Sequence, residues 1–155
     1  MFKSKLTILL ASFLSINAQA VSLAGDWDCK PEVHGEAAEN APKASFILSI
    51  NEDLSQFIRH TELSISTGLY QAPAVVLNTV EEGTVVFIDD ELILSPSDVE
   101  MDVIEGESLV TEEIEKNLKD QLLRDEIGTV APDGNDKFSV YLSGYDQTNH
   151  CVRLK

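Results

Sequence analysis

The sequence predicts a mostly β protein: an antiparallel meander of about eight strands, forming a barrel or half-open barrel, with one amphipathic helix. Three observations support this fold class. Apolar and polar residues alternate through most of the chain, which is typical of strands with one buried face. Short segments rich in Gly, Asn and Asp separate these stretches, as expected for turns. Only residues 111–127 follow a helical period instead.

The first twenty residues, MFKSKLTILLASFLSINAQA, have the pattern of an export signal. Lys3 and Lys5 precede an apolar stretch, and Ala-Gln-Ala at the end forms a cleavage site of small residues. The apolar stretch is shorter than the roughly 20 residues that cross a bilayer, so we expect no membrane span. We expect residues 1–20 to be removed and residues 21–155 to form a single exported domain, in the periplasm or secreted.

The chain is strongly acidic, with 27 Asp and Glu against 11 Lys and Arg, and a formal net charge of −16. Nucleic acids and anionic membrane surfaces bind mainly through Lys and Arg, so the charge argues against both as partners. A large net charge also keeps a protein soluble, and this is the simpler interpretation.

The first half of the chain contains two alternating segments and one predicted hairpin. SFILSI places Phe46, Leu48 and Ile50 on one face, and FIRHTELSIS places Phe57, Leu63 and Ile65 on one face. APAVVLNTV and TVVFI are interpreted as two strands joined by a turn at Glu81-Glu82-Gly83. The side chains expected to point inward from the first two segments include Phe46, Leu48, Phe57 and Leu63.

The second half adds further strands on both sides of the helix. ELILS follows Asp89-Asp90, and in DVEMDVIE the residues Val99, Met101 and Val103 alternate with acids. After the turn APDGND, KFSVYL places Phe138 and Val140 on one face, and HCVRL ends the series. We expect the apolar residues of these strands to face a common core.

The helix is predicted to span residues 111–127. Thr111 can cap its start, the acids that follow suit the positive end of the helix dipole, and Gly128 can end it. We expect the sheet to cover its apolar stripe, because acids dominate the polar side. The stripe consists of Ile114, Leu118, Leu122, Leu123 and Ile127.

The two cysteines, Cys29 and Cys151, lie near the two ends of the predicted domain. An even number of cysteines in an exported chain predicts a disulfide, whereas a metal site would need further ligands that are not evident nearby. Closure of a meander makes the first and last strands neighbours, so this disulfide would join them. Arg153 would then lie over the face of Trp27 in a cation–π contact.

The segment Gly25-Asp26-Trp27 and the late Arg153 resemble the lipocalin-like (calycin) families, which open with Gly-x-Trp on the first strand and place a late arginine across that tryptophan. The resemblance implies a barrel that these residues help to close, and a loop at residues 30–43 that partly covers a cavity mouth. This loop either gates a ligand or is simply mobile. LAGDW also resembles the start of small periplasmic inhibitors of secreted metalloproteases, which share a calycin-type barrel. The chain departs from lipocalins in lacking a Thr-Asp-Tyr-type turn and in placing its helix before the last two strands.

We predict no catalytic residue, cofactor or metal. His34, His60 and His150 do not match a known metal-ligand spacing, and no serine lies in a Gly-x-Ser-x-Gly turn. The acidic turns DGND and IDDE offer oxygen ligands without the spaced twelve-residue calcium loop, which leaves calcium binding open.

The sequence therefore predicts an exported, non-catalytic binding protein that holds a small apolar or amphipathic ligand in a barrel interior. The alternative is a protein-interaction module of the cell envelope, such as an inhibitor or assembly factor, acting through its acidic surface. Small barrels can also be filled by their own side chains, so the existence of a cavity is left open. The expected ligand-binding residues are Phe46, Leu48, Phe57, Leu63, Val99, Met101, Val103, Phe138 and Val140.

Overall fold

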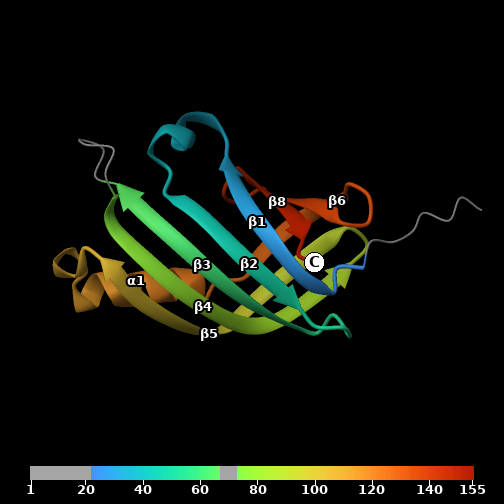
Figure 1. The fold of residues 1–155 in the computed structure, drawn as a ribbon, viewed down its shortest axis with the longest axis horizontal. Coiled ribbons are helices and arrows are strands. Elements are labelled where there is room, and N and C mark those ends of the chain that lie inside the picture. The colour runs from blue at the N-terminus through green and yellow to red at the C-terminus, as the bar shows by residue number, and fades with distance from the viewer. Residues whose placement is uncertain (1–21, 67–72) are drawn as a thin grey trace, which may run out of the picture.

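Eight strands follow one another around a closed barrel in a computed structural model that describes residues 22–66 and 73–155 (Figure 1). Every neighbouring pair is antiparallel, and the last strand pairs with the first. The predicted fold class is thus confirmed, whereas the expected signal at residues 1–20 lies outside the described residues. The strands are β1 (Gly25–Val33), β2 (Lys43–Ile50), β3 (Gln56–Ser66), β4 (Pro73–Ile88), β5 (Glu91–Glu105), β6 (Glu126–Pro132), β7 (Lys137–Leu142) and β8 (Gln147–Arg153).

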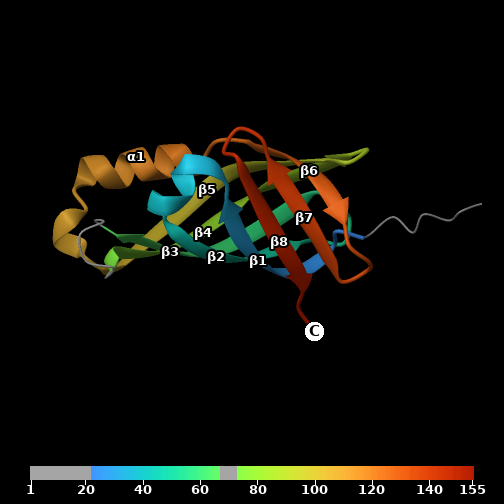
Figure 2. The same ribbon diagram turned by 90° about the horizontal axis from the view of Figure 1, so that it is seen from above.

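Three helical segments accompany the barrel in the described part of the chain. The 3-10 helix η1 (Gly35–Asn40) follows β1, and η2 (Glu107–Leu109) and the α-helix α1 (Glu112–Leu122) lie between β5 and β6. Figure 2 shows α1 running alongside β5, beyond the short stretch in which β5 pairs with β6. In the described part of the chain, no helix is long and apolar enough to cross a membrane.

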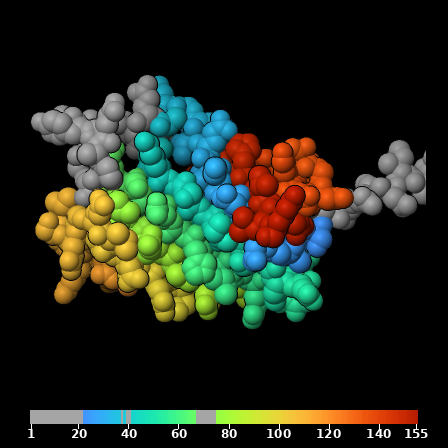
Figure 3. Space-filling model, viewed as in Figure 1, coloured from blue at the N-terminus to red at the C-terminus, as the bar shows by residue number. Residues whose placement is uncertain are grey.

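The first and last strands are joined by a disulfide. Cys29 and Cys151 lie opposite each other in the β1–β8 register and form the predicted bond, with their Cα atoms 4.1 Å apart. Figure 3 shows the last residues of the chain beside the first strand at this seam. Disulfides persist in oxidising compartments, so the bond is in keeping with a location outside the cytoplasm.

Arg153 lies at the same seam, with its guanidinium carbon 4.1 Å from the centre of the Trp27 ring. The guanidinium also donates hydrogen bonds to the backbone carbonyls of Ala24 and Ser22, each at 2.8 Å. Gly25 has a φ of 119°, and a Cβ atom there would come within 2.6 Å of Arg153 Nη1. Glycine therefore leaves the room that the guanidinium needs, and the three residues singled out for barrel closure lie together.

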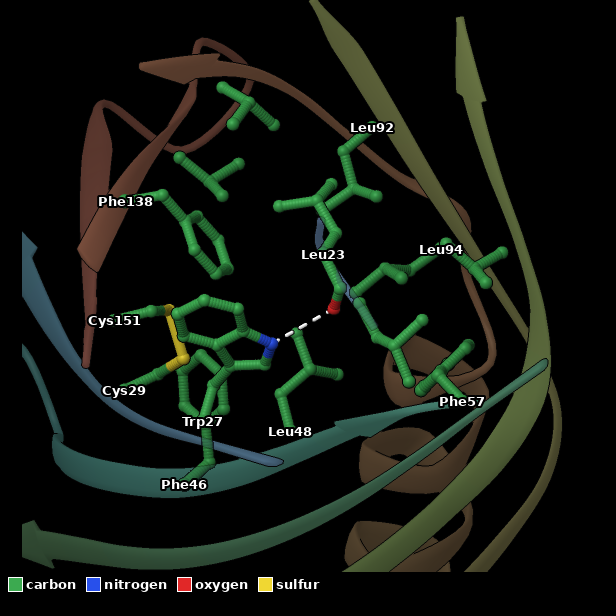
Figure 4. Packing of buried hydrophobic residues seen from close by; sticks show 14 of the residues in the cluster. Leu23, Trp27, Cys29, Phe46, Leu48, Phe57, Leu92, Leu94, Phe138 and Cys151 are labelled. Carbon is green, nitrogen blue, oxygen red and sulfur yellow. Dashed lines mark hydrogen bonds between the residues drawn. A yellow bond between two sulfur atoms is a disulfide. The ribbon is translucent and has the colours of Figure 1, made fainter. Parts of the chain in front are cut away.

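One half of the barrel interior is packed with apolar side chains (Figure 4). Trp27 is fully buried, and its Nε1 donates to the Leu23 carbonyl at 2.9 Å. The Phe138 ring meets it edge-on, with ring centres 4.6 Å apart. Leu23, which precedes β1, packs within this cluster rather than extending into solvent. Phe57 and Leu92 complete the same core.

The hairpin turn predicted at Glu81-Glu82-Gly83 is wrong. β4 continues through these residues and pairs with β5 as far as Ile88, and the chain turns at Asp89-Asp90 instead. The two glutamates alternate as strand residues do, because Glu82 is exposed whereas Glu81 is buried. The segment has the composition of a turn, but its residues are strand residues and Glu81 points into the barrel.

Gly83 is needed where β4 crosses close to β5. A Cβ atom there would lie 2.2 Å from the Ser95 carbonyl oxygen and 2.7 Å from Pro96 Cα, and backbone atoms cannot move aside as a side chain can. We expect Gly83→Ala to lower the free energy of unfolding by about 1–3 kcal/mol, measured by urea denaturation. Gly144→Ala is the matched control, because a Cβ atom there meets nothing within 4 Å. Equal stability of the two variants would contradict the close approach.

The predicted helix at residues 111–127 is too long. Thr111 caps it as expected, with its Oγ1 accepting from the Ile114 backbone N–H at 3.3 Å, but α1 ends at Leu122. Gly128, expected to end the helix, is a buried residue of β6 that packs against Val140 and Leu142. Residues 126–132 are a strand because they pair with β5 on one side and β7 on the other.

The sheet covers only part of the predicted apolar stripe of the helix. Leu118 and Leu122 are half-buried, as expected. In contrast, Ile114, Leu123 and Ile127 are 43%, 39% and 52% exposed. The helical spacing of Ile127 is therefore coincidental, because this residue belongs to the outer face of β6.

Candidate functional site

The described side chains leave the other half of the barrel interior open. A cavity of about 1130 Å³ lies at the end where β1, β3 and β5 finish and β2, β4 and β8 begin. Leu118 and Leu122 of α1 also line it. Small-molecule sites commonly measure roughly 300–1,000 Å³, so this cavity can enclose a small ligand. The alternative that the barrel is filled by its own side chains therefore applies to one half only.

Strand register stacks the interior side chains of β2–β5 in layers. Each layer takes one residue from each of the four strands, directly opposite its neighbours. Arg59 and Glu81 of the lowest layer form the charged floor of the cavity, whereas the layers above carry no charge. From floor to mouth the layers are Leu48, Arg59, Glu81 and Val99; then Phe46, Thr61, Thr79 and Met101; then Ala44, Leu63, Leu77 and Val103.

Arg59 is held inside the barrel between two carboxylates, and we call Arg59, Glu81 and Glu126 the ion triad. Its Nε donates to Glu81 Oε1 at 3.2 Å, and its Nη2 donates to Glu81 Oε2. On the other side, Nη1 and Nη2 donate to Glu126 Oε2 and Oε1 at 2.8 and 2.7 Å. Both pairs are bidentate, which is the strong geometry for arginine and carboxylate. The side chains of Arg59 and Glu81 are 6% and 1% exposed, and that of Glu126 is 20% exposed.

The pKa values of Arg59 and Glu81, the two buried members of the ion triad, are raised for different reasons. Burial alone would lower the pKa of Arg59, but the carboxylates of Glu126 and Glu81 outweigh burial and raise the pKa, so the guanidinium stays charged. Burial raises the pKa of the Glu81 carboxyl above its ordinary value of 4.5, although Arg59 opposes this shift. The folded protein therefore holds a proton on Glu81 at pH values where the unfolded chain has released it.

The raised pKa of Glu81 predicts a pH-dependent effect of Glu81→Gln. The stabilising contribution of Glu81 protonation is fully present below pH 4.5 and is lost as pH rises through the higher folded-state pKa. The free energy of unfolding of the wild type minus that of the variant should therefore fall as pH increases from about 4 to 8. Urea denaturation at each pH measures this difference. Glu82→Gln, on the exposed face of the same strand, is the control, and a difference that rises with pH for Glu81→Gln would contradict the shift.

The structure divides the nine expected ligand-binding residues between two regions. Three of them, Phe46, Leu63 and Met101, line the large cavity. Val99 lies in its floor layer, and Val103 faces the interior one layer above Met101. The other four do not line this cavity and are buried in the apolar core, to which Phe46 also belongs. These four are Leu48, Phe57, Phe138 and Val140.

Sequence reasoning did not identify the ion triad. The signal for Arg59 was present, because it alternates in phase with Phe57 and Leu63 and so must point inward with them. The inward position of Glu81 and Glu126 could not be inferred, because Glu81 was assigned to a turn and Glu126 to a helix.

The predicted loop at residues 30–43 is shorter than expected and lies at the cavity mouth. β1 extends to Val33, η1 follows, and Ala38, Ala41 and Pro42 line the cavity. His34 anchors this segment to the β7–β8 end of the barrel. Its backbone N–H donates to the Asp146 carbonyl at 2.9 Å, and its Nε2 lies 2.9 Å from Thr148 Oγ1.

The remaining histidines lie on the outer surface. His60 and Glu62 are both exposed on β3. His150 joins three strands, with its Nε2 2.8 Å from Glu32 Oε2 and its Nδ1 3.0 Å from Ser139 Oγ. None of the three histidines lines the large cavity, and the contacts of His34 and His150 connect β1 and the segment after it to β7 and β8. Among residues 22–66 and 73–155, no group of three or more His, Cys, Asp or Glu side chains is arranged to hold a metal ion.

No protein-family model matches the chain, and a search of curated proteins found no match. The function is therefore inferred from the cavity and from the residues that line it.

Proposed function

We propose that this protein is a non-catalytic binding protein that holds a small amphipathic ligand in the hollow half of its barrel. The observation that supports this most is the cavity of about 1130 Å³ above the ion triad. Eight-strand barrels have an interior of the size that encloses one small ligand, as in lipocalins. The Gly25-Asp26-Trp27 start and the contact between Arg153 and Trp27 support a lipocalin-like relationship.

The distribution of polarity in the cavity favours an amphipathic ligand over a purely apolar one. Phe46, Leu77 and Met101 supply apolar wall, whereas the floor is a set of buried charges. A wholly apolar ligand pressed onto the ion triad would remove water from charged groups without replacing its hydrogen bonds, which is costly. A ligand with a polar end and an apolar body satisfies both regions.

We also propose that the protein acts outside the cytoplasm, in the periplasm or after secretion. The Cys29–Cys151 disulfide and the export pattern of the first twenty residues support this location. Sizing the protein by mass spectrometry after expression in its own host would test it, because a chain that still carries residues 1–20 contradicts export by a cleaved signal.

The binding proposal is tested with the neutral fluorescent probe N-phenyl-1-naphthylamine on protein that has been delipidated by unfolding and refolding. We expect saturable binding to the wild type and at least about tenfold weaker binding to Thr61→Trp, which fills the cavity one layer above the floor. Thr84→Trp is the matched control, because Thr84 is exposed on the outside of β4 and should leave binding unchanged.

Leu118→Trp gives a second route to the same result, because it fills the cavity from α1 without touching a strand. Circular dichroism would establish that each variant is folded. Absence of probe binding to the wild type, or equal binding to folded Thr61→Trp, Leu118→Trp and Thr84→Trp, would overturn the proposal. Native mass spectrometry of undelipidated protein would show whether a natural ligand stays bound through purification.

A protein-interaction role is the second candidate, and the outer face of β3–β5 favours it. Seven acids of these three strands are exposed, and the only Lys or Arg in the strands is Arg59, which points inward. An interface of this kind should weaken with added salt. Capture from envelope extract that disappears at high salt and in Glu100→Gln/Asp102→Asn, but persists in Thr61→Trp, would favour this candidate. The seven acids are Glu62, Glu82, Glu91, Asp98, Glu100, Asp102 and Glu105.

A further inference from the structure

Resting on the proposed function, we infer that the polar end of the ligand is an ammonium group, so that the cavity selects an organic amine with an apolar body. The first ground is the charge of the floor. Arg59 supplies one positive charge, and Glu81 and Glu126 supply two negative charges when both are ionised. Protonation of either carboxyl leaves the floor neutral, so in neither state does it present net positive charge to an anion.

The hydrogen-bonding capacity of the floor also favours an ammonium group. Arginine has five N–H donors, and four of those of Arg59 are already directed at Glu81 and Glu126. Each carboxylate oxygen can accept about two hydrogen bonds, and only Glu81 Oε1 has two donors, from Arg59 and from Thr79. The floor therefore has spare acceptors and almost no spare donors, which suits a donor-rich ammonium and not a carboxylate or phosphate.

Glu126 is the member of the ion triad that a ligand can reach. Its side chain is 20% exposed and lines the cavity, whereas that of Glu81 is 1% exposed. It opens β6 immediately after the helix segment, so it lies between the floor and the Leu118–Leu122 wall. An ammonium that descends along this wall would meet the Glu126 carboxylate first.

The cavity lining also includes two cationic side chains, Lys43 and Arg124. Both are exposed, so water and salt screen their charges. The ion triad is buried, and charges in a low-dielectric interior act more strongly on a neighbouring group than exposed charges do. The formal net charge of −16 adds a general attraction for cations around the protein. The floor thus decides which polar group is preferred inside.

The test compares three probes that share a twelve-carbon chain and differ only in their head group: dodecylamine, dodecanol and dodecanoate. Each competes with N-phenyl-1-naphthylamine below its micelle-forming concentration at neutral pH. We expect dodecylamine to bind at least about tenfold more tightly than dodecanol, and dodecanoate to bind more weakly than dodecanol. Glu126→Gln should remove most of the amine preference, whereas Glu126→Asp, which keeps the charge, should retain it in part.

Glu100→Gln is the control for non-specific attraction, because it removes one exposed acid from the outer face of β5. An amine preference that falls equally in Glu100→Gln and Glu126→Gln would overturn the inference, as would tighter binding of dodecanoate than of dodecylamine. Both results leave the cavity as a binding site, because all probes would still displace the fluorophore. Failure of the wild type to bind the fluorophore or any of the three chains would instead overturn the proposed function itself.

Discussion

Replacing Arg59 with methionine is expected to lower the free energy of unfolding by about 3–5 kcal/mol, because the change leaves two carboxylates in the barrel interior without a cation. Glu81 is 1% exposed and Glu126 is 20% exposed, so water cannot take over the role of the guanidinium at the first of them. Methionine fills a similar length, which limits the contribution of lost packing. Urea denaturation near neutral pH measures the loss.

The double variant Arg59→Met/Glu81→Gln separates the electrostatic loss from a packing loss. Removing the more buried carboxyl should restore part of the lost stability, because one uncompensated charge disappears. A single variant that loses less than about 1 kcal/mol would contradict the account of the ion triad. A double variant no more stable than Arg59→Met would do the same.

The double variant Cys29→Ala/Cys151→Ala is expected to lose about 2–5 kcal/mol of unfolding free energy. The disulfide links residues separated by 122 positions, so it constrains nearly the whole chain in its unfolded state. It also joins β1 to β8, which fixes the seam at which the barrel closes. The measurement is urea denaturation of the wild type and variant, with and without a reducing agent.

Reducing agent should bring the wild type close to the variant and leave the variant unchanged. The contact between Arg153 and Trp27 and the backbone pairing of β1 with β8 remain in the variant, so we expect it to fold. Equal stability of the oxidised wild type and the variant would show that the disulfide does not constrain the unfolded chain as described.

The seam of the barrel was predictable from the sequence because its signals are few and unambiguous. Two cysteines in a chain with an export pattern have one partner each, and joining Cys29 to Cys151 brings Trp27 and Arg153 to the same seam. The alternation of apolar and polar residues also predicted which segments are strands, because it shows directly that one face of each segment is buried. These features depend on single residues or on local pattern.

The ion triad could not be predicted in the same way, because it depends on pairing between strands. Arg59 meets Glu81 only through the β3–β4 register, and it meets Glu126 across the barrel interior. Local pattern was misleading at both acids: Glu81-Glu82-Gly83 has turn composition, and Ile127 continues a helical period. The contacts between distant strands overrode both local preferences.

The cavity could not be predicted from the local sequence pattern either. Phe57 and Met101 are both inward-facing apolar residues of long strands, yet one packs in the core and the other lines the hollow. The difference arises because Leu23 and Trp27 fill one half of the barrel, whereas no comparable described side chain fills the other. Alternation reports which face is buried but not how much space the opposite wall leaves.

A methyl NMR titration of delipidated protein with N-phenyl-1-naphthylamine tests the central claim most directly. A ligand held above the ion triad should shift the methyl signals of Leu77, Met101 and Leu118, which line the cavity, and leave those of Val85 and Leu92 in the packed core unchanged. Shifts confined to exposed methyl groups on the outer surface, with those three signals unmoved, would contradict an interior binding site.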